Sequence, residues 1–309
     1  MAIRLISCVG VRNDLAMLPH FIRHYLALGI APAHMHLILQ ASQPCLELDA
    51  AIALLHDFSL AEPELWLEPY TSDAMWEKRR AVQTRCADGA DWVISADVDE
   101  LHDYPAPLHE VLGWCDARSI NCIQGPFIDR LAANGRLKPV VASPAVEVQF
   151  PIQAEVICAI RGGAQEPGFR YGTVKVMALK GDLMPSRGGH HPRGDGIAPR
   201  FLAGQPLAEF SASTRPAFRF AFPFKVHHYK WVATLVPGTR ERVGTAGVSA
   251  AGKRYGELLL QRFADEERIS FDDVAIRRPM LADRISWTTR VQGLRSLARA
   301  EKLIRRIRR

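Results

Sequence analysis

The first hundred residues alternate between short apolar runs and longer segments in which apolar residues recur every three or four positions. Runs of branched apolar residues are typical of strands buried on both faces, whereas the three-to-four spacing indicates one face of a helix. Regular alternation of the two predicts a parallel sheet covered by helices. We expect strands at 3–11, 34–39, 64–70 and 91–98, and helices at 15–30, 45–58 and 74–90.

The chain beyond the fourth expected strand follows a less regular pattern. A short helix is expected at 108–115 and a strand at 120–131. The segment 139–235 is rich in Pro and Gly, which predicts irregular structure with a few added strands. Helical spacing returns near the C-terminus. We therefore predict one α/β domain over 1–235, built on a mixed sheet flanked by helices, and a C-terminal helical extension over 236–309.

The chain of 309 residues has a formal net charge of +6, and the C-terminal stretch carries much of this positive excess. Its apolar residues Leu294, Leu297, Leu303 and Ile307 fall near helical spacing, which predicts a basic amphipathic helix. Two interpretations stay open, a solvated terminal helix and a helix that contacts an anionic membrane surface. The basic residues of this stretch are Arg295, Arg299, Lys302, Arg305, Arg306, Arg308 and Arg309, against the single acid Glu301.

Six cysteines are scattered along the chain without a CxxC pair, and no secretory leader precedes them. Such thiols are typical of a reducing compartment, so we expect them to be buried and unpaired and the protein to be cytoplasmic. No apolar run approaches the roughly 20 residues that a membrane-spanning helix needs. A peripheral position at the inner face of the membrane stays open through the basic tail.

The fourth expected strand runs into an acidic cluster, in "DWVISADVDE". Ligands of such sheets bind beyond the carboxyl ends of the strands. Since alternate strand residues share a face, Asp97 and Asp99 are predicted to project together, and Glu100 to point away and hold the turn or a basic neighbour. Paired carboxylates repel unless a cation lies between them, and Mn²⁺ or Mg²⁺ bound to few carboxylates completes its shell with water and substrate phosphates. The pattern indicates a metal site for a diphosphate-bearing substrate, with turn capping or arginine pairing as the alternative.

Two adjacent histidine pairs follow in the second half of the chain. In "SRGGHHP" two glycines permit close backbone approach, so a histidine of this loop is predicted to complete the metal site. We take His191 for this role, with His190 an equal alternative. In "KVHHYKW", His228 and Lys230 are predicted to lie against the diphosphate and offset leaving-group charge.

Several of these segments together resemble glycosyltransferase family 2-like proteins. They are "CVGVRNDLAMLPHFIRHYLALGI", "DWVISADVDEL", "GPFIDRLAANGRL", "GGHHP" and "KVHHYKW", within residues 3–235. The resemblance implies a GT-A fold, a Rossmann-like nucleotide-diphospho-sugar transferase architecture. It also implies transfer of a sugar from a nucleotide-diphosphate donor, for which we favour a UDP-sugar, to a glycan or glycolipid acceptor.

The resemblance also implies roles for individual residues. Asp99 would be the principal metal ligand, and Asp97 would lie near the ribose or the metal. The chain departs from the family after the second strand, where "LILQASQP" offers only Gln40 and Ser42. The residues expected to contact the nucleotide-sugar are Arg12, Asn13, Asp14, Arg79, Asp97, Val98, His228 and Lys230.

An inverting transfer needs a carboxylate that accepts the proton of the acceptor hydroxyl. Asp129 in "FIDR" and Glu155 in "PIQAEV" are the candidates for this catalytic base. Asp129 has the alternative of pairing with Arg130 or capping a turn. Glu155 has the alternative of stabilising the first turn of a helix.

Two other classes of function compete with this one. A nucleotidyltransferase-like enzyme would carry a Gly-rich phosphate loop after the first strand, whereas "CVGVRND" has one glycine. A non-catalytic protein that binds an anionic surface through its basic tail would need basic and aromatic residues spread over the main domain. The charges of that domain are mixed, so we also expect no nucleic-acid partner.

Overall fold

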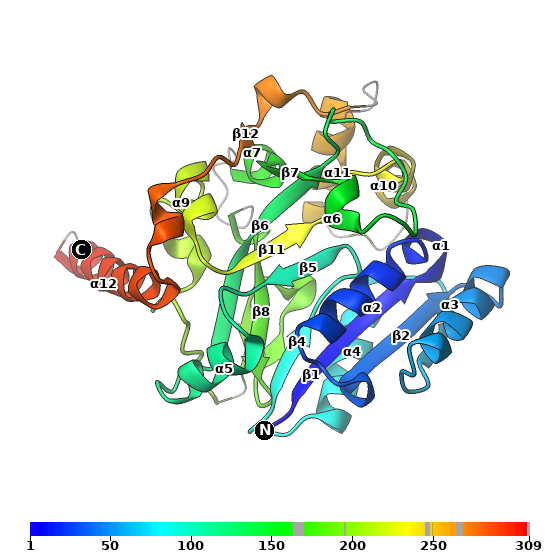
Figure 1. Cartoon of the computed structure of the whole chain (residues 1–309), viewed down its shortest axis with the longest axis horizontal. Helices are drawn as coiled ribbons and strands as arrows, with labels where there is room; N and C mark the ends of the chain where they lie inside the picture. The colour runs from blue at the N-terminus through cyan, green and yellow to red at the C-terminus, as the bar shows by residue number, and fades with distance from the viewer. Residues whose placement is uncertain (163–169, 195, 245–247, 249, 264–267, 308–309) are drawn as a thin grey trace.

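A mixed β-sheet flanked by helices forms the centre of the computed structural model (Figure 1). The predicted α/β class, with a helix at the C-terminus, is confirmed. The structure describes residues 1–162, 170–194, 196–244, 248, 250–263 and 268–307.

The N-terminal third builds the parallel half of the sheet. Its elements are β1 (Ile3–Gly10), α1 (Val11–Asp14), α2 (Leu18–Ala27), β2 (Met35–Ala41), α3 (Leu46–Asp57), β3 (Glu64–Leu67), α4 (Ser72–Cys86) and β4 (Trp92–Ser95). Strand β1 pairs in parallel with β2 and β4, and β2 pairs in parallel with β3. The predicted alternation of strands and helices is therefore confirmed in this part of the chain.

The middle of the chain adds the antiparallel half. Its elements are β5 (Glu100–Asp103), α5 (Leu108–Asp116), β6 (Cys122–Leu131), α6 (Val146–Gln149), β7 (Ile152–Glu155), α7 (Val156–Gly162), β8 (Val174–Lys180), β9 (Met184–Pro185), β10 (Pro192–Arg193), α9 (Pro216–Ala221) and β11 (Lys225–His228). Strand β8 lies at the centre of the sheet, antiparallel to both β4 and β6. The expectation of irregular structure over 139–235 understated this strand, because a buried lysine interrupts its apolar run.

The C-terminal part packs on the same core as the rest of the chain. Its elements are α10 (Leu235–Gly244), α11 (Ala250–Phe263), β12 (Ala275–Ile276) and α12 (Trp287–Ile307). Strand β12 pairs with β7, and Trp287 packs against Trp114 of α5 with ring centroids 5.0 Å apart. Tyr255 and Leu259 of α11 join the main hydrophobic cluster. The domain boundary at residue 235 stays a prediction, and both parts share one core.

The strand order is β12-β7-β6-β8-β4-β1-β2-β3, with β11 pairing antiparallel to β5 and parallel to β6. Alternate residues of β1 face opposite layers, as the strand period requires. Leu5 and Val9 join the cluster that contains α2 and α3, whereas Ile6 and Cys8 join the cluster under α4. The sheet is thus covered on both faces, and its carboxyl edge is left for the loops.

The helix expected at 15–30 is confirmed in shortened form as α2, which begins at Leu18 with a proline in its first turn. A separate single turn, α1, precedes it and follows β1 directly. Gly29 has a φ of 89° just after α2, a conformation that glycine adopts without steric cost and that commonly ends helices. The segment predicted to contact a nucleotide is therefore a short helical turn at the end of the first strand.

The prediction that the fourth strand spans 91–98 is wrong, because β4 ends at Ser95 before the acids. The Glu100 amide donates to the Asp97 carbonyl at 3.0 Å, and the Asp97 amide donates to the Glu100 carboxylate at 3.1 Å. These bonds close a turn that leads into β5. The alternation of strand side chains therefore does not align Asp97 with Asp99, and the turn sets their arrangement.

The six cysteines are free, as expected, but only four of them are buried, since Cys45 and Cys86 are partly exposed. Within the described residues, no helix combines the length and the apolar character that crossing a membrane requires. The helix predicted at the basic C-terminus is confirmed as α12, while Arg308 and Arg309 lie outside the described residues.

We predict that buried His102 of β5 makes the fold sensitive to acid. Burial, together with the positive charges of Lys175 and His24, lowers the pKa of His102 to about 3. Because the unfolded chain binds this proton near pH 6.5, stability falls as the pH drops from about 6.5 toward 3, by up to ~1.4 kcal/mol per pH unit. Unfolding in urea at pH 7 and pH 5 should show that His102→Phe loses ~2 kcal/mol less than the wild type. Equal losses in the two proteins would contradict the assignment.

Candidate active site at the carboxyl edge of the sheet

Two bases and two acids form a network beneath the turn after β4. The Asp97 carboxylate accepts hydrogen bonds from Arg79 of α4 at 2.6 Å and from Lys175 of β8 at 2.9 Å. The same lysine donates to Glu100 at 2.9 Å. The side chains of Arg79 and Lys175 are each 1% exposed, so both charges depend on these carboxylates rather than on water.

Burial and mutual attraction set the charges of this network. Burial alone would raise the pKa of Asp97, but Lys175 and Arg79 hold it well below its usual range. Burial raises the pKa of Glu100 to about 7, with help from the Asp97 and Asp99 carboxylates and against the effect of Lys175. Asp97 is therefore the permanent counter-charge of the two bases. The prediction that Glu100 holds the turn or a basic neighbour is confirmed, because it does both.

Lys175 is the member of this network that the sequence patterns did not reveal. It occupies the second position of the apolar run "VKVMALK" and lies under the loop that carries the first histidine pair. Gly189 in this loop has a φ of 67°, and a Cβ there would lie 2.7 Å from Lys175 Cε and 2.9 Å from Trp76 Cη2. A lysine inside a buried strand is rare unless it is paired with an acid. The lysine within this apolar run is therefore the sequence feature from which a buried ion pair could have been predicted.

A second cluster links β6, β11 and the turn. The two strands run parallel with His228 beside Asp129. The His228 Nδ1 lies 3.1 Å from Asp129 Oδ1, and its Nε2 lies 3.6 Å from Asp99 Oδ2. The Asp129 carboxylate also accepts from the Trp231 indole at 2.7 Å and from the first two amides of α7 at 2.8 and 2.7 Å. Since this carboxylate serves as an acceptor throughout, Nδ1 of His228 carries the donated hydrogen, and the other ring nitrogen, Nε2, faces Asp99.

The two acids predicted as catalytic base lie inside the protein. Asp129 is fully buried, and both of its oxygens accept hydrogen bonds from the chain. Glu155 is equally buried and accepts from Arg219 at 2.8 Å; burial raises its pKa to about 7 although Arg219 opposes the shift. Neither carboxylate is placed to meet an acceptor hydroxyl. In this geometry Asp129 orients His228, and Glu155 holds Arg219.

The residues of α1 lie near Asp97 and Asp99, at the same edge of the sheet. Arg12 and Asn13 are exposed. The Asp14 carboxylate accepts from the Gly10 amide at 2.9 Å. Burial, followed by repulsion from Asp99, raises the pKa of Asp14 to about 7. The turn α1 therefore places the carboxyl group of Asp14 near Asp99, beside the exposed side chains of Arg12 and Asn13.

Three other predicted nucleotide contacts have different surroundings. The Val98 side chain is buried in the core, so its predicted contact with a nucleotide would have to be made by the backbone. Arg79 is buried too, and it holds Asp97 rather than reaching outward from α4. The Lys230 amine lies 4.6 Å from the centre of the Tyr255 ring of α11. Of these three, only Lys230 is partly exposed, just beyond the end of β11.

The adjacent histidines 190 and 191 separate in space. The His191 ring packs on Tyr171, with centroids 4.5 Å apart. The His190 ring packs on Phe127 at 6.3 Å, and the same phenylalanine packs on His228 at 4.8 Å. The prediction that His191 joins the acids is not supported by these contacts, and His190 is the one of the pair that lies toward them.

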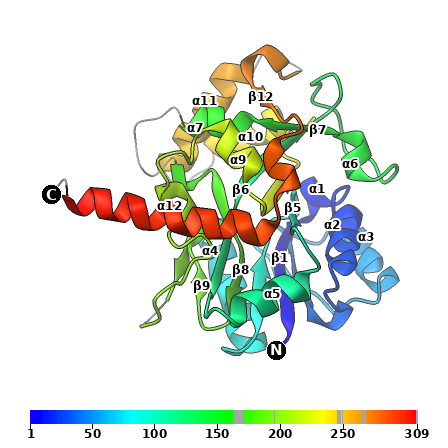
Figure 2. The same ribbon diagram turned by 60° about the vertical axis from the view of Figure 1, so that its left-hand side comes forward.

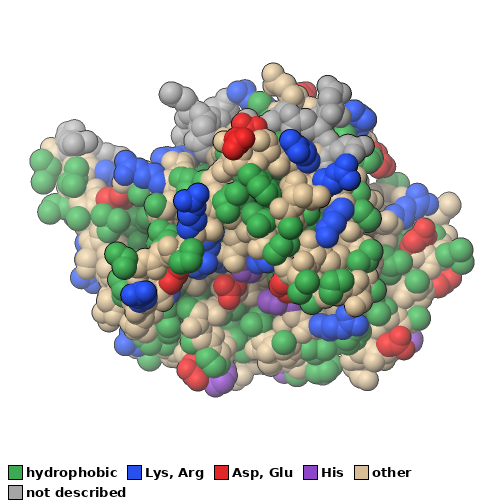
Figure 3. All heavy atoms as spheres, turned by 45° about the horizontal axis from the view of Figure 1, so that its top comes forward, with side chains coloured by type: hydrophobic (Ala, Val, Ile, Leu, Met, Phe, Trp, Pro, Cys, Tyr) green, Lys and Arg blue, Asp and Glu red, His purple; other side chains and the backbone are tan. Residues whose placement is uncertain are grey.

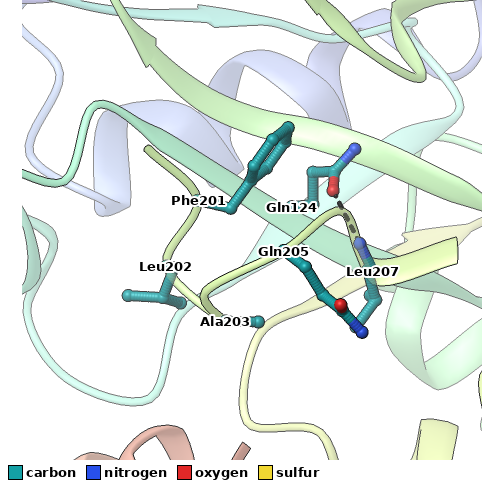
Figure 4. Close-up of a pocket in the computed structure, with 6 residues that line it drawn as sticks. All are labelled: Gln124, Phe201, Leu202, Ala203, Gln205 and Leu207. Carbon is teal, nitrogen blue, oxygen red and sulfur yellow. Dashed lines mark hydrogen bonds between the residues drawn. The ribbon is translucent and has the colours of Figure 1, made fainter. Parts of the chain in front are cut away.

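Figure 3 shows acidic and histidine side chains next to one another near the middle of one face, with Lys and Arg side chains close by. A separate shallow depression lies elsewhere, where the Leu207 amide donates to the Gln124 side chain at 2.9 Å (Figure 4). None of the acids described above lines it. Its lining residues are Gln124, Phe201, Leu202, Ala203, Gln205 and Leu207.

Comparison with known proteins gives distant structural likenesses. No family model and no curated protein matches the chain. Among solved structures, residues 1–349 of TarS from S. aureus are similar, with 12% identity and a TM-score of 0.33 over 95% of this chain and 83% of that chain. At this identity and TM-score two chains need not share an activity. The functional assignment therefore rests on the side chains.

We predict that the buried network behaves as one energetic unit. Lys175→Met leaves Glu100 buried without its partner, so unfolding in urea should show a loss of about 3–5 kcal/mol. The double variant Lys175→Met/Glu100→Gln removes both charges and should lose clearly less than the two single losses together. Additive losses would show that the two side chains do not depend on each other.

Proposed function

We propose that this protein is a metal-dependent glycosyltransferase of the GT-A type. In this proposal the donor is a nucleotide-diphosphate sugar, with UDP as the favoured nucleotide, and the acceptor is a glycan or a glycolipid. The observation that carries the proposal is the pair Asp99 and His228, whose Oδ2 and Nε2 atoms face each other at 3.6 Å at the carboxyl edge of the sheet. Ligand sites of open α/β sheets lie at this edge.

The chemistry of this pair fits a divalent cation. In the tautomer that carries its hydrogen on Nδ1, the imidazole presents an Nε2 lone pair to the Asp99 carboxylate, and a bound cation between these two acceptors would make their approach favourable. The other ring nitrogen of His228 is bound to Asp129, the arrangement that orients histidine ligands in metal sites. Imidazole and carboxylate ligands together favour Mn²⁺ over Mg²⁺. We therefore propose Asp99 and His228 as the ligands, in place of Asp97 and His191.

The protein supplies only part of the coordination in this proposal. Among the described residues, no group of three or more His, Cys, Asp or Glu is placed to hold a metal ion. Water and the donor diphosphate would complete the shell, as is usual for such ions bound through few protein ligands. When bound, the ion would neutralise the charge that develops on the leaving nucleotide.

The remaining residues position the donor in this proposal. Asp97, clamped by two buried bases, holds the turn that carries Asp99. Arg12 and Asn13, exposed on α1, contact the nucleotide, and Lys230 lies by the diphosphate. A nucleotidyltransferase would need a Gly-rich loop in this place, whereas the turn α1 follows β1 directly.

Asp99→Asn and His228→Ala should each lower metal-dependent nucleotide release from a UDP-sugar by more than about 100-fold, because each removes one of two protein ligands. Mn²⁺ binding in the presence of UDP, measured by calorimetry, should weaken in parallel. Asp57→Asn is the matched control, since Asp57 is an exposed acid at the far end of α3. Full activity in either ligand variant would refute the metal assignment.

Asp129→Asn tests the positioning role of that carboxylate. We expect the Mn²⁺ concentration for half-maximal activity to rise about 10–100-fold, because His228 loses the acceptor that orients it. Activity at saturating Mn²⁺ should recover substantially. If Asp129 were instead the catalytic base, the activity would stay low at every metal concentration, and this outcome separates the two roles.

A further inference from the structure

The C-terminal helix α12 presents an apolar stripe to solvent. Figure 2 shows α12 crossing the body of the protein and extending beyond it toward the C-terminus. Four large apolar side chains on the helix are exposed, Leu297 by 39%, Leu303 by 59%, Ile304 by 48% and Ile307 by 75%. With 3.6 residues per turn, these positions fall on one side of the helix.

The opposite side of α12 is held by the body of the protein. Val291 and Ala298 are buried. The Glu301 carboxylate accepts from the Ser211 hydroxyl at 2.6 Å and from the Gln205 amide at 3.0 Å. These contacts fix the rotation of the helix about its axis. The apolar stripe is therefore directed away from the protein by the fold and does not result from a loosely attached tail.

The exposed stripe is bordered by positive charge. Arg299 and Arg306 are exposed, two turns apart, and form no ion pair with the described residues. Arg305, in contrast, reaches Glu209 on the body side. Over α12 the basic residues are Arg290, Arg295, Arg299, Lys302, Arg305 and Arg306, against the single acid Glu301.

We propose that α12 docks the protein on an anionic membrane surface, with the apolar stripe in the headgroup region and Arg299 and Arg306 against lipid phosphates. An amphipathic helix with a basic border binds such surfaces through apolar burial and electrostatic attraction together. The long arginine stems permit this, because they keep the guanidinium at the polar level while the stripe enters the bilayer. A second copy of the chain fits the face less well, since two-fold pairing brings the same unpaired arginines of both copies together.

The test uses the full chain and needs no activity, so its result does not depend on the proposed function. Flotation should show binding to phosphatidylcholine vesicles that contain phosphatidylglycerol, a loss of binding at high salt, and little binding to pure phosphatidylcholine. Arg299→Gln/Arg306→Gln should weaken partitioning about fivefold for each arginine. Leu303→Gln/Ile307→Gln should weaken it by at least about tenfold. Leu281→Gln, at an exposed position just before α12, should leave it unchanged.

Two results would overturn the proposal. One is wild-type binding that is absent, or equal for neutral and anionic vesicles. The other is a concentration-dependent dimer in sedimentation that Leu303→Gln/Ile307→Gln abolishes, which would assign the stripe to a second copy of the chain. Circular dichroism should report unchanged folding for all variants, because every substituted side chain is exposed.

Discussion

The pairing of Asp97 with two buried bases is the interaction on which the geometry of the edge depends. Arg79 and Lys175 come from a helix and a strand on different parts of the chain, and neither is hydrated. A buried charge without a partner costs several kcal/mol, so the fold is stable only with a carboxylate between them. The contacts of Asp97 with these two bases fix the position of the turn after β4. Asp99 lies two residues further along this turn, so its position is fixed as well.

The two aspartates of the D-x-D pattern therefore have different environments despite their near identity in sequence. Asp97 is used by the protein itself, as the anion that neutralises its interior. Asp99 contacts a histidine whose orientation is fixed by a buried carboxylate, although the Asp99 side chain is about as exposed as that of Asp97. The same separation applies to the histidine pairs, where strand or loop geometry directs one ring inward and its neighbour elsewhere.

The sequence predicted the layered architecture well because burial patterns are local and periodic. The first four strands and their helices follow directly from the spacing of apolar residues. The site was less predictable, because its partners are distant in the chain. The sequence around Asp97 does not predict its contact with Lys175, and the sequence around His228 does not predict its contact with Asp129. The sequence around a carboxylate also does not show whether it faces water or accepts hydrogen bonds inside the protein. For this reason Asp129 and Glu155 both fit a catalytic base by sequence alone.

The position of β11 has a consequence for the order in which the site can form. Within the described structure, β5 pairs only with β11, and β11 is inserted between β5 and β6. The Tyr229 amide then donates to the Asp99 carbonyl at 2.8 Å, which closes the turn from the far side. Asp97 and Asp99 are synthesised early, but His228, which contacts Asp99, follows more than 120 residues later in the chain. During translation, the N-terminal sheet can fold first, while ligand binding must wait for the segment around residue 228.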